Sequence, residues 1–270
     1  MAHSKLPDVY IISLARSQER RQLMEAQKNA LIEAGYTGKI TFFDAVDAAD
    51  PQFAKKSRYS AIRAHITGKP LTPGEQACYA SHYNLWKLVL NFRNENEDTP
   101  KHENGIIVME DDIKICPEEF ISAARACMHS TWDCVRLSTS KRIHSYTITP
   151  PFFTAPNAGG GAQAYFLRCA AAQRFLKHSR KWVRPVDDFM DRYWQNNVEY
   201  ILYHPTPIAS FETESEIDAF PQKRAITCKS RSWWARPAKE IFRIFDKFRK
   251  TRSWNKFSYE KSVGFCRIQY

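Results

Sequence analysis

An apolar segment that ends abruptly in three carboxylates constrains the fold more than any other feature of this sequence. Residues 105–109 read GIIVM, and Glu110, Asp111 and Asp112 follow directly. A short apolar run rich in β-branched residues is typical of a strand buried inside an α/β sheet. The three charges must then lie at one end of that strand, where open α/β sheets bind their ligands.

Three adjacent carboxylates repel one another, and burying each one costs free energy unless an opposite charge compensates. A divalent cation would compensate, and oxygen ligands favour Mg²⁺ or Mn²⁺, usually shared with substrate phosphates. Strand alternation predicts that Glu110 and Asp112 point the same way and Asp111 the opposite way. The alternative is an acidic turn that faces solvent. We favour the metal site because the charges follow a strand.

The N-terminal residues predict a β-α-β unit, which begins many α/β sheets and leaves a nucleotide-sized crevice at the strand ends. Residues 9–14 (VYIISL) and 40–43 (ITFF) are short apolar segments typical of strands. The helix between them would be capped by Ser17 and would end at Gly35. Residues 50–70 are basic and rich in turn formers, so they predict an irregular excursion.

A clear helix start follows at residues 72–75. Thr72 can cap the helix, Pro73 suits its first position, and Glu75 can bond back to the N–H of the cap residue. The helix should run to about Asn91, which would place Glu75 and His82 on one face. A single histidine on a helix is more often structural than catalytic.

The pattern after the carboxylates alternates between helices and strands. It predicts helices at 117–129, 170–179 and 186–196, strands at 134–137, 164–167 and 199–203, and a Pro/Gly-rich substrate loop at 149–161. Gly160 and Gly161 lie in that loop and would let a ligand approach the backbone closely. As a phosphate signal this glycine run is weak, because it lacks the lysine of a P-loop.

A second acidic cluster begins the helix predicted at 186–196. Asp187 and Asp191 are four residues apart and would share a helix face, with Asp188 beside them. The helix dipole alone favours acidic residues in a first turn. Spacing therefore gives this cluster no specific role.

Charge divides the chain into two parts. The net charge is +11, and residues 223–270 hold 14 Lys or Arg against 3 Asp or Glu, which leaves residues 1–222 neutral. Residues 237–250 of this basic tail form an amphipathic helical pattern. Its apolar face contains Ile241, Phe242, Phe245 and Phe248. Such a helix is typical of binding to an anionic membrane surface; the alternative is that the phenylalanines pack on the body.

The sequence also bears on the compartment. The first seven residues are polar, and no stretch approaches the ~20 apolar residues that span a bilayer, so we expect no secretory signal and no transmembrane helix. Seven cysteines without a C-x-x-C pair favour free thiols in a reducing cytosol. We expect a cytoplasmic protein that binds peripherally to the inner face of the cytoplasmic membrane.

Seven segments stand in a specific order along residues 9–210. They are IISLARSQERR (11–21), FFDAVDA (42–48), LTPGEQACYASHYNLWK (71–87), IVMEDDI (107–113), VRL (135–137), GGAQAYFLR (160–168) and RPVDD (184–188). In this order they resemble glycosyltransferase family 25, the bacterial lipooligosaccharide galactosyltransferases related to collagen galactosyltransferases.

The resemblance implies a GT-A-like α/β domain with a central, mainly parallel sheet at residues 1–222, followed by the basic tail. It implies inverting transfer of a hexose from a UDP-sugar to a hydroxyl of a lipooligosaccharide or lipopolysaccharide core. We therefore expect a UDP-galactose-dependent β-galactosyltransferase. Its cofactor would be Mn²⁺ or Mg²⁺, and its acceptor a lipid-linked oligosaccharide.

The matching motifs imply roles for individual residues. Asp112 would be the chief ligand of the metal, assisted by Glu110. The residues expected to bind the donor are Ser13, Arg16, Arg20, Asp44, Asp47, Glu75, His82, Glu110, Asp111, Gly160 and Gly161. Asp187 matches the P-V-D motif and is expected to be the catalytic base, with Asp188 as second choice. The family's usual Gly-Thr is Gly161-Ala162 here, so one threonine hydroxyl is missing.

Two other functions remain as alternatives. A pI of about 9.3 and the Arg/Lys/Trp-rich tail suggest a nucleic-acid-binding protein. The neutral body and the lack of a nucleic-acid motif count against it, so we expect no nucleic-acid partner. A glycoside hydrolase that uses two of the carboxylates is the other alternative.

Overall fold

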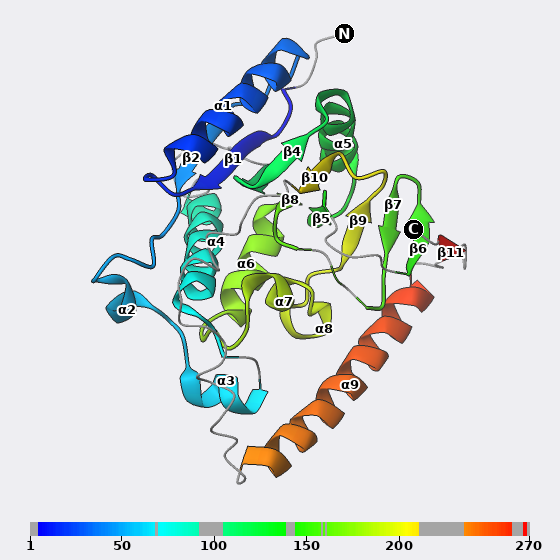
Figure 1. The fold of residues 1–270 in the computed structure, drawn as a ribbon. Coiled ribbons are helices and arrows are strands. Elements are labelled where there is room, and N and C mark those ends of the chain that lie inside the picture. The colour runs from blue at the N-terminus through cyan, green and yellow to red at the C-terminus, as the bar shows by residue number, and fades with distance from the viewer. Residues whose placement is uncertain are drawn as a thin grey trace.

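A nine-stranded sheet forms the centre of the molecule, and helices cover both of its faces (Figure 1). The structure, a computed structural model, describes residues 5–67, 70–91, 105–138, 144–157, 159, 161–210, 235–260 and 267–268. The strand order is β11-β6-β7-β9-β5-β8-β3-β1-β2. The strands of this sheet are β1 (Asp8–Ser13), β2 (Ile40–Asp44), β3 (Ile106–Glu110), β5 (Cys134–Arg136), β6 (Ser145–Thr149), β7 (Phe152–Thr154), β8 (Ala164–Leu167), β9 (Ile201–Tyr203) and β11 (Arg267–Ile268).

The predicted α/β class is confirmed. The prediction of a mainly parallel sheet is confirmed in the sense that most of the strands run in the same direction. Strands β1, β2, β3, β5, β6 and β9 run one way, and β7, β8 and β11 run the other way. Because the reversed strands are interleaved among the others, most neighbouring pairs are antiparallel. A separate antiparallel pair joins β4 (Ile113–Ile115) to β10 (Ile208–Ser210).

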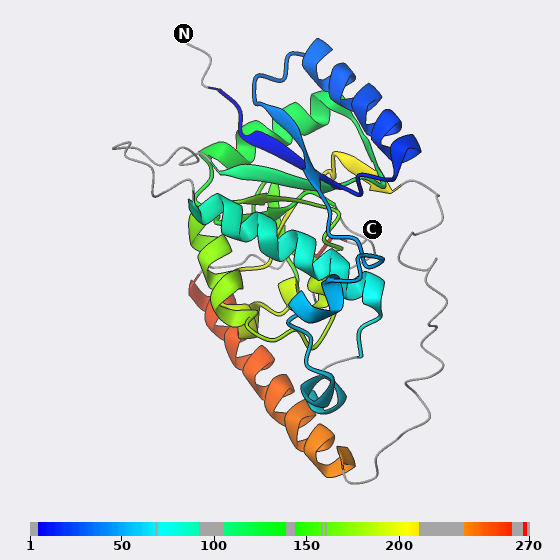
Figure 2. The same ribbon diagram turned by 90° about the vertical axis from the view of Figure 1, so that its left-hand side faces the viewer.

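Four helices form the layers on the two faces of the sheet. The helices of the described chain are α1 (Gln18–Glu33), α2 (Phe53–Lys56), α3 (Ala61–Thr67), α4 (Pro73–Asn91), α5 (Pro117–His129), α6 (Cys169–His178), α7 (Val186–Met190), α8 (Tyr193–Asn196) and α9 (Ala235–Glu260). Helices α1 and α5 lie on one face of the sheet, and α4 and α6 on the other (Figure 2). None of the helices that the structure describes is long and apolar enough to cross a bilayer.

Strand β3 divides its side chains between the two layers. Ile107 and Met109 are fully buried in the core with α1 and α5, whereas Ile106 and Val108 are buried in the core with α4 and α6. This alternation is the two-residue period of a strand. If this alternation continues by one residue, the side chain of Glu110 points toward α4.

Helix α4 begins as the sequence predicts. The N–H of Glu75 donates to Thr72 Oγ1 at 3.2 Å, and the N–H of Thr72 donates to Glu75 Oε2 at 2.8 Å. These reciprocal bonds form a capping box. Ser17 occupies the N-cap position of α1 but makes no side-chain cap hydrogen bond, so its predicted role as a cap is wrong.

Three segments differ from the prediction. Residues 50–70 contain helices α2 and α3, and the predicted loop at 149–161 contains strand β7. The helix predicted at 186–196 is two short helices, α7 and α8, and Asp191 is the C-cap of α7. Asp187 and Asp191 still lie one helical turn apart, because the N–H of Asp191 donates to the Asp187 carbonyl at 2.9 Å. Strands as short as β7 carry too few residues to show a period.

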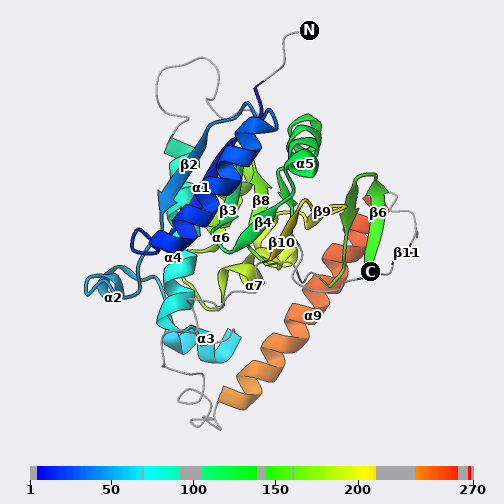
Figure 3. The ribbon, with the colours of Figure 1, turned by 45° about the horizontal axis from the view of Figure 1, so that its top comes forward.

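Helix α9 lies against α3 and α8, along one side of the molecule (Figure 3). Part of its attachment is polar: Asp246 accepts hydrogen bonds from Arg192, from Trp194 Nε1 at 2.7 Å and from Gln195 Nε2 at 2.6 Å. Part is apolar, because Phe257 packs against the core and Trp254 against Tyr146. The side chains of the predicted apolar face differ in exposure. Ile241 is 55% exposed and Phe245 and Phe248 are each 63% exposed, whereas Phe242 is half-buried. Packing of Phe245 and Phe248 on the body, the alternative drawn from the sequence, is wrong.

Candidate active site

A pocket opens where strands β1 and β3 end, between helices α1 and α4, with a cavity volume of about 110 Å³. Eight of the residues predicted for donor and metal binding line it: Ser13, Arg16, Arg20, Asp47, His82, Glu110, Asp111 and Asp112. Parallel pairing of β1 with β3 brings these distant segments to one edge of the sheet.

Two cations reach this pocket, Arg20 from helix α1 and Arg16 from the loop that precedes it. Arg20 Nη1 lies 3.1 Å from Asp111 Oδ1, and Arg16 Nε lies 2.7 Å from Asp47 Oδ2. Burial alone would raise the pKa of Asp47, but the N–H of Ala49 and the Arg16 guanidinium outweigh it and lower that pKa. Asp111 thus faces α1, the side opposite to Glu110, as strand alternation predicts.

Asp112 is the least compensated of the three carboxylates. Its Oδ1 is buried and has no hydrogen-bond partner among the residues that the structure describes. Burial and the negative charge of Glu110 raise the pKa of Asp112 to about 7, against the lowering influence of Arg20. A buried acceptor without a donor, next to two further carboxylates, is the arrangement that a divalent cation would complete.

Glu110 belongs to a hydrogen-bonded chain that reaches into the core. His82 Nε2 lies 3.0 Å from Glu110 Oε1, and His82 Nδ1 lies 2.9 Å from the hydroxyl of Tyr165. That hydroxyl also accepts a hydrogen bond from Trp86 Nε1 at 2.9 Å. Because an indole N–H can only donate, the Tyr165 proton remains available for Nδ1, and His82 Nε2–H then donates to the carboxylate.

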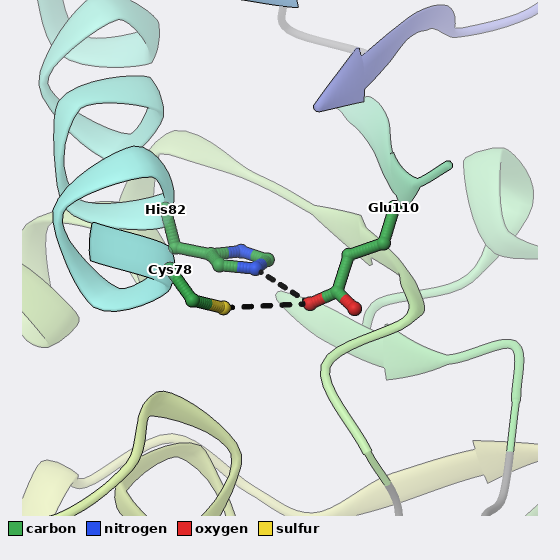
Figure 4. A group of neighbouring side chains, drawn as sticks. All are labelled: Cys78, His82 and Glu110. Atoms are coloured by element: carbon green, nitrogen blue, oxygen red, sulfur yellow. Dashed lines mark hydrogen bonds and ion pairs between the residues drawn. The ribbon is translucent and has the colours of Figure 1, made fainter. Parts of the chain in front are cut away.

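Cys78 is a member of this site that the sequence analysis did not select. Its Sγ lies 3.8 Å from Glu110 Oε1, and the ligand atoms of Cys78, His82 and Glu110 are all within 4.8 Å of one another (Figure 4). Burial, then the charges of Glu110, Asp187 and Asp112, raises the pKa of the thiol. Cys78 and His82 are four residues apart on α4, and this helical spacing was the available signal.

The second acidic cluster lies next to a buried arginine, also missed by the sequence analysis. Arg136 on β5 donates to Asp191 Oδ1 at 3.2 Å and to the carbonyl of Gly161 at 3.3 Å. Asp187 accepts the N–H of Asp188 at 2.8 Å, and burial raises the pKa of Asp187. A charged residue within the apolar strand at 134–137 was the signal for Arg136.

The structure does not bring every predicted residue into the pocket. Asp44 is 76% exposed and pairs with Arg21 of helix α1. Glu75 is engaged in the capping box, and Asp188 pairs with Arg184 and Arg192. Gly161 is placed by Arg136, while Gly160 lies outside the described residues.

Residues 6–190 match the model of glycosyltransferase family 25, described as an LPS biosynthesis protein family. A viral relative, the procollagen lysyl hydroxylase and glycosyltransferase of Acanthamoeba polyphaga mimivirus, is 29% identical over 62% of this chain and 19% of its own length. Human procollagen galactosyltransferase 2 is 30% identical over 76% of this chain and 32% of its own length.

A further human relative, inactive glycosyltransferase 25 family member 3, is 26% identical over 68% of this chain and 31% of its own length. These alignments span between about a fifth and a third of the relatives' lengths. The family segment contains the carboxylates at the end of β3, Arg16 and Arg20, and Asp187 and Asp188 of α7. This chain therefore belongs to glycosyltransferase family 25.

Proposed function

We propose that the protein transfers galactose from UDP-galactose, with inversion, to a hydroxyl of a lipooligosaccharide or lipopolysaccharide core. The observation that carries this proposal is the placement of Arg16 and Arg20 opposite Glu110, Asp111 and Asp112 in one pocket. Cations suit a diphosphate, and carboxylates suit the cation that accompanies it. The similarity to procollagen galactosyltransferases supports galactose as the sugar.

The residues at the end of β3 fit Mn²⁺ or Mg²⁺. Asp112 and Glu110 would hold the ion, and the unpartnered Oδ1 of Asp112 supports this fit. When bound, the ion supplies Lewis-acid stabilisation of the charge that develops on the leaving diphosphate. His82 contacts the Glu110 carboxylate from the core side, and the ion pair with Arg20 holds Asp111 on the side opposite to Glu110.

Asp187 is the proposed base, with Asp188 as second choice. A base works best when its pKa lies near the working pH, and burial moves the pKa of Asp187 in that direction. The carboxylate would remove the acceptor proton while the hydroxyl attacks the anomeric carbon from the face opposite the diphosphate. The Asp188 N–H holds Asp187 in place.

The decisive experiment measures acceptor-dependent release of UDP and, separately, binding of UDP-galactose. Asp187→Asn should lower turnover by 10²-fold or more, as the loss of a general base does, while UDP-galactose still binds. Glu33→Gln, an exposed residue at the end of α1, is the matched control. Normal turnover in Asp187→Asn would refute the base assignment. Failure of the intact protein to bind any UDP-sugar would refute the transferase.

The exposed face of α9 supports the proposed peripheral binding to the cytoplasmic membrane. Ile241, Ile244, Phe245 and Phe248 point away from the body, each more than half exposed. Arg243, Lys247, Arg249 and Arg252 on the same helix are exposed too. Apolar side chains flanked by cations suit an anionic lipid surface, where each cation contributes about 1 kcal/mol.

Vesicle sedimentation tests this surface directly. The protein should sediment with vesicles containing phosphatidylglycerol and less with vesicles of phosphatidylcholine alone. Replacing Phe245 and Phe248 by Ser should reduce the bound fraction several-fold. Ile62→Ser, which removes an apolar side chain 74% exposed on α3, is the matched control and should bind as the parent does. Equal sedimentation of all forms would refute the membrane proposal.

A further inference from the structure

A second cavity, of about 350 Å³, lies where the C-terminal half of α9 meets the body. Four of the side chains that line it are aromatic: Tyr193, Tyr200, Trp254 and Phe257. Two of them come from α9, and the other two from α8 and from the segment that leads into β9. The family segment ends at residue 190, so all four lie beyond it.

The polar groups of this cavity exclude several classes of ligand. Among the described residues, Glu199, Glu260 and Asn197 line it, against a single cation, Lys256, whose Nζ lies 3.7 Å from Glu260 Oε1. With more carboxylates than ammonium groups, the cavity disfavours phosphates and nucleotides. A purely apolar ligand would leave the carboxylates desolvated without partners.

A neutral ligand with many hydroxyls suits both the polar and the aromatic residues that line the cavity. Carboxylates and an amide accept and donate hydrogen bonds to hydroxyl groups. Aromatic rings cover the apolar C–H faces of such a ligand while their polar tips remain available. A saccharide is the class of molecule that presents hydroxyl edges and C–H faces together.

The walls are held in place before any ligand arrives. Tyr200 is buried, its carbonyl accepts a hydrogen bond from Thr154 Oγ1 at 2.7 Å, and its ring lies 5.9 Å from the Arg136 guanidinium. The Trp254 ring packs against Phe257, with 6.2 Å between ring centroids. Fixed aromatic walls lower the entropy lost on binding.

Tyr193 contributes a hydroxyl that its surroundings leave unsatisfied. The oxygen is buried and lacks a hydrogen-bond partner within the described part of the chain. Burial raises the pKa of Tyr193 to about 12, so the hydroxyl keeps its proton at neutral pH. Tyr193 also lines the cavity, and a ligand hydroxyl that reaches this oxygen would supply the missing hydrogen bond.

Arg136 connects this cavity with the candidate active site. Its guanidinium lies over the Tyr200 ring and also reaches Asp191 and the Gly161 carbonyl, next to the segment that carries Asp187. We propose that the cavity binds remote sugar units of the acceptor oligosaccharide while its terminal hydroxyl lies near Asp187. This inference rests on the proposed glycosyl transfer and names the substrate class of a second subsite.

The test uses the full chain and lipid-free core oligosaccharide released from lipopolysaccharide by mild acid. Trp254→Ala should raise the KM for this acceptor about tenfold and leave the KM for UDP-galactose within twofold. Tyr259→Ala removes an aromatic ring that is 87% exposed on the same helix and does not line the cavity, so it should leave both KM values unchanged. Tyr193→Phe removes a single hydroxyl, keeps the ring, and should raise the acceptor KM several-fold.

Two further measurements separate this proposal from the proposed activity. With a monosaccharide acceptor, Trp254→Ala should match the parent, because the acceptor is too short to reach the cavity. Saccharide protons should show saturation transfer from the aromatic protons of the parent but not of Trp254→Ala, even without UDP-galactose. Unchanged acceptor KM and equal saturation transfer in both forms would overturn the subsite. A parent protein that binds oligosaccharide yet no UDP-sugar would instead overturn the transferase.

Discussion

His82 Nε2 lies 3.0 Å from Glu110 Oε1, and this contact joins the middle of helix α4 to the end of strand β3. The carboxylate at the mouth of the pocket is thereby connected to Tyr165 and Trp86 in the core. The position of Glu110 therefore depends on residues that no substrate would touch.

Tyr165→Phe tests this connection. The variant leaves the Trp86 indole N–H buried without an acceptor, which costs about 1–3 kcal/mol of unfolding free energy. Urea unfolding of parent and variant measures the difference. Tyr259→Phe, at a tyrosine 87% exposed on α9, should change the free energy by less than about 0.5 kcal/mol. Equal stability of the Tyr165 variant and the parent would mean that the chain of hydrogen bonds contributes little.

Asp112→Asn should stabilise the metal-free protein at alkaline pH. Because the pKa of Asp112 is raised to about 7, the folded protein holds a proton that the unfolded chain releases near 3.8. Stability therefore falls as pH rises from about 4 to 7, and the amide removes this dependence. Thermal unfolding in EDTA at pH 4 and pH 8 should show a gain over the parent only at pH 8. A gain of the same size at both values would contradict the raised pKa.

Asp246→Asn should loosen helix α9. The substitution removes one partner of a part-buried ion pair, so Arg192 loses the carboxylate that compensates its charge from α9 and keeps its pairing with Asp188. Backbone amides of α9 should exchange with deuterium faster than in the parent, whereas those of α4 should not change. Partial burial alone would raise the pKa of Asp246, but the hydrogen bond from Trp194 and the charge of Arg192 outweigh it and lower that pKa. The stabilisation is therefore present above the usual aspartate pKa and is lost as pH falls through the lowered one. Unchanged exchange in α9 would refute the anchor.

Gly105→Ala should destabilise the protein strongly. Gly105 has a φ of +78°, and an added Cβ would overlap the Phe166 ring. The left-handed conformation costs about 1–2 kcal/mol for alanine, and the overlap adds to it. Gly35→Ala isolates the first effect, because Gly35 has a φ of +92° and open space around it. Chemical unfolding should show a larger loss of unfolding free energy for Gly105→Ala than for Gly35→Ala. Equal losses would rule out the steric contribution of the Phe166 ring.

Local patterns predicted the elements that place the site. The apolar run before Glu110 is strand β3, and the Thr72–Glu75 pattern begins helix α4. Each pattern lies within a single segment. Burial explains the apolar run of the strand, and capping explains the start of the helix. Strand alternation also predicted that Glu110 and Asp111 face opposite layers, which their contacts with His82 and Arg20 show.

Contacts between distant segments could not be predicted in the same way. The pairing of Arg136 with Asp191 depends on how β5 and α7 meet, and neither segment encodes its partner. The outward orientation of Phe245 depends on Asp246, whose partners lie about 50 residues earlier in the chain. An amphipathic pattern shows that a helix has two faces, and only the tertiary contacts decide which face is covered.

The position of β9 limits how the chain can be shortened for laboratory work. This strand, Ile201–Tyr203, lies in the interior of the sheet between β5 and β7, although the family segment ends at residue 190. A recombinant fragment cut at that boundary would expose unpaired edges on both neighbours, and such edges promote aggregation. Any truncated form made for crystallisation or inhibitor screening should therefore extend beyond Ser210, so that it also keeps β10 paired with β4.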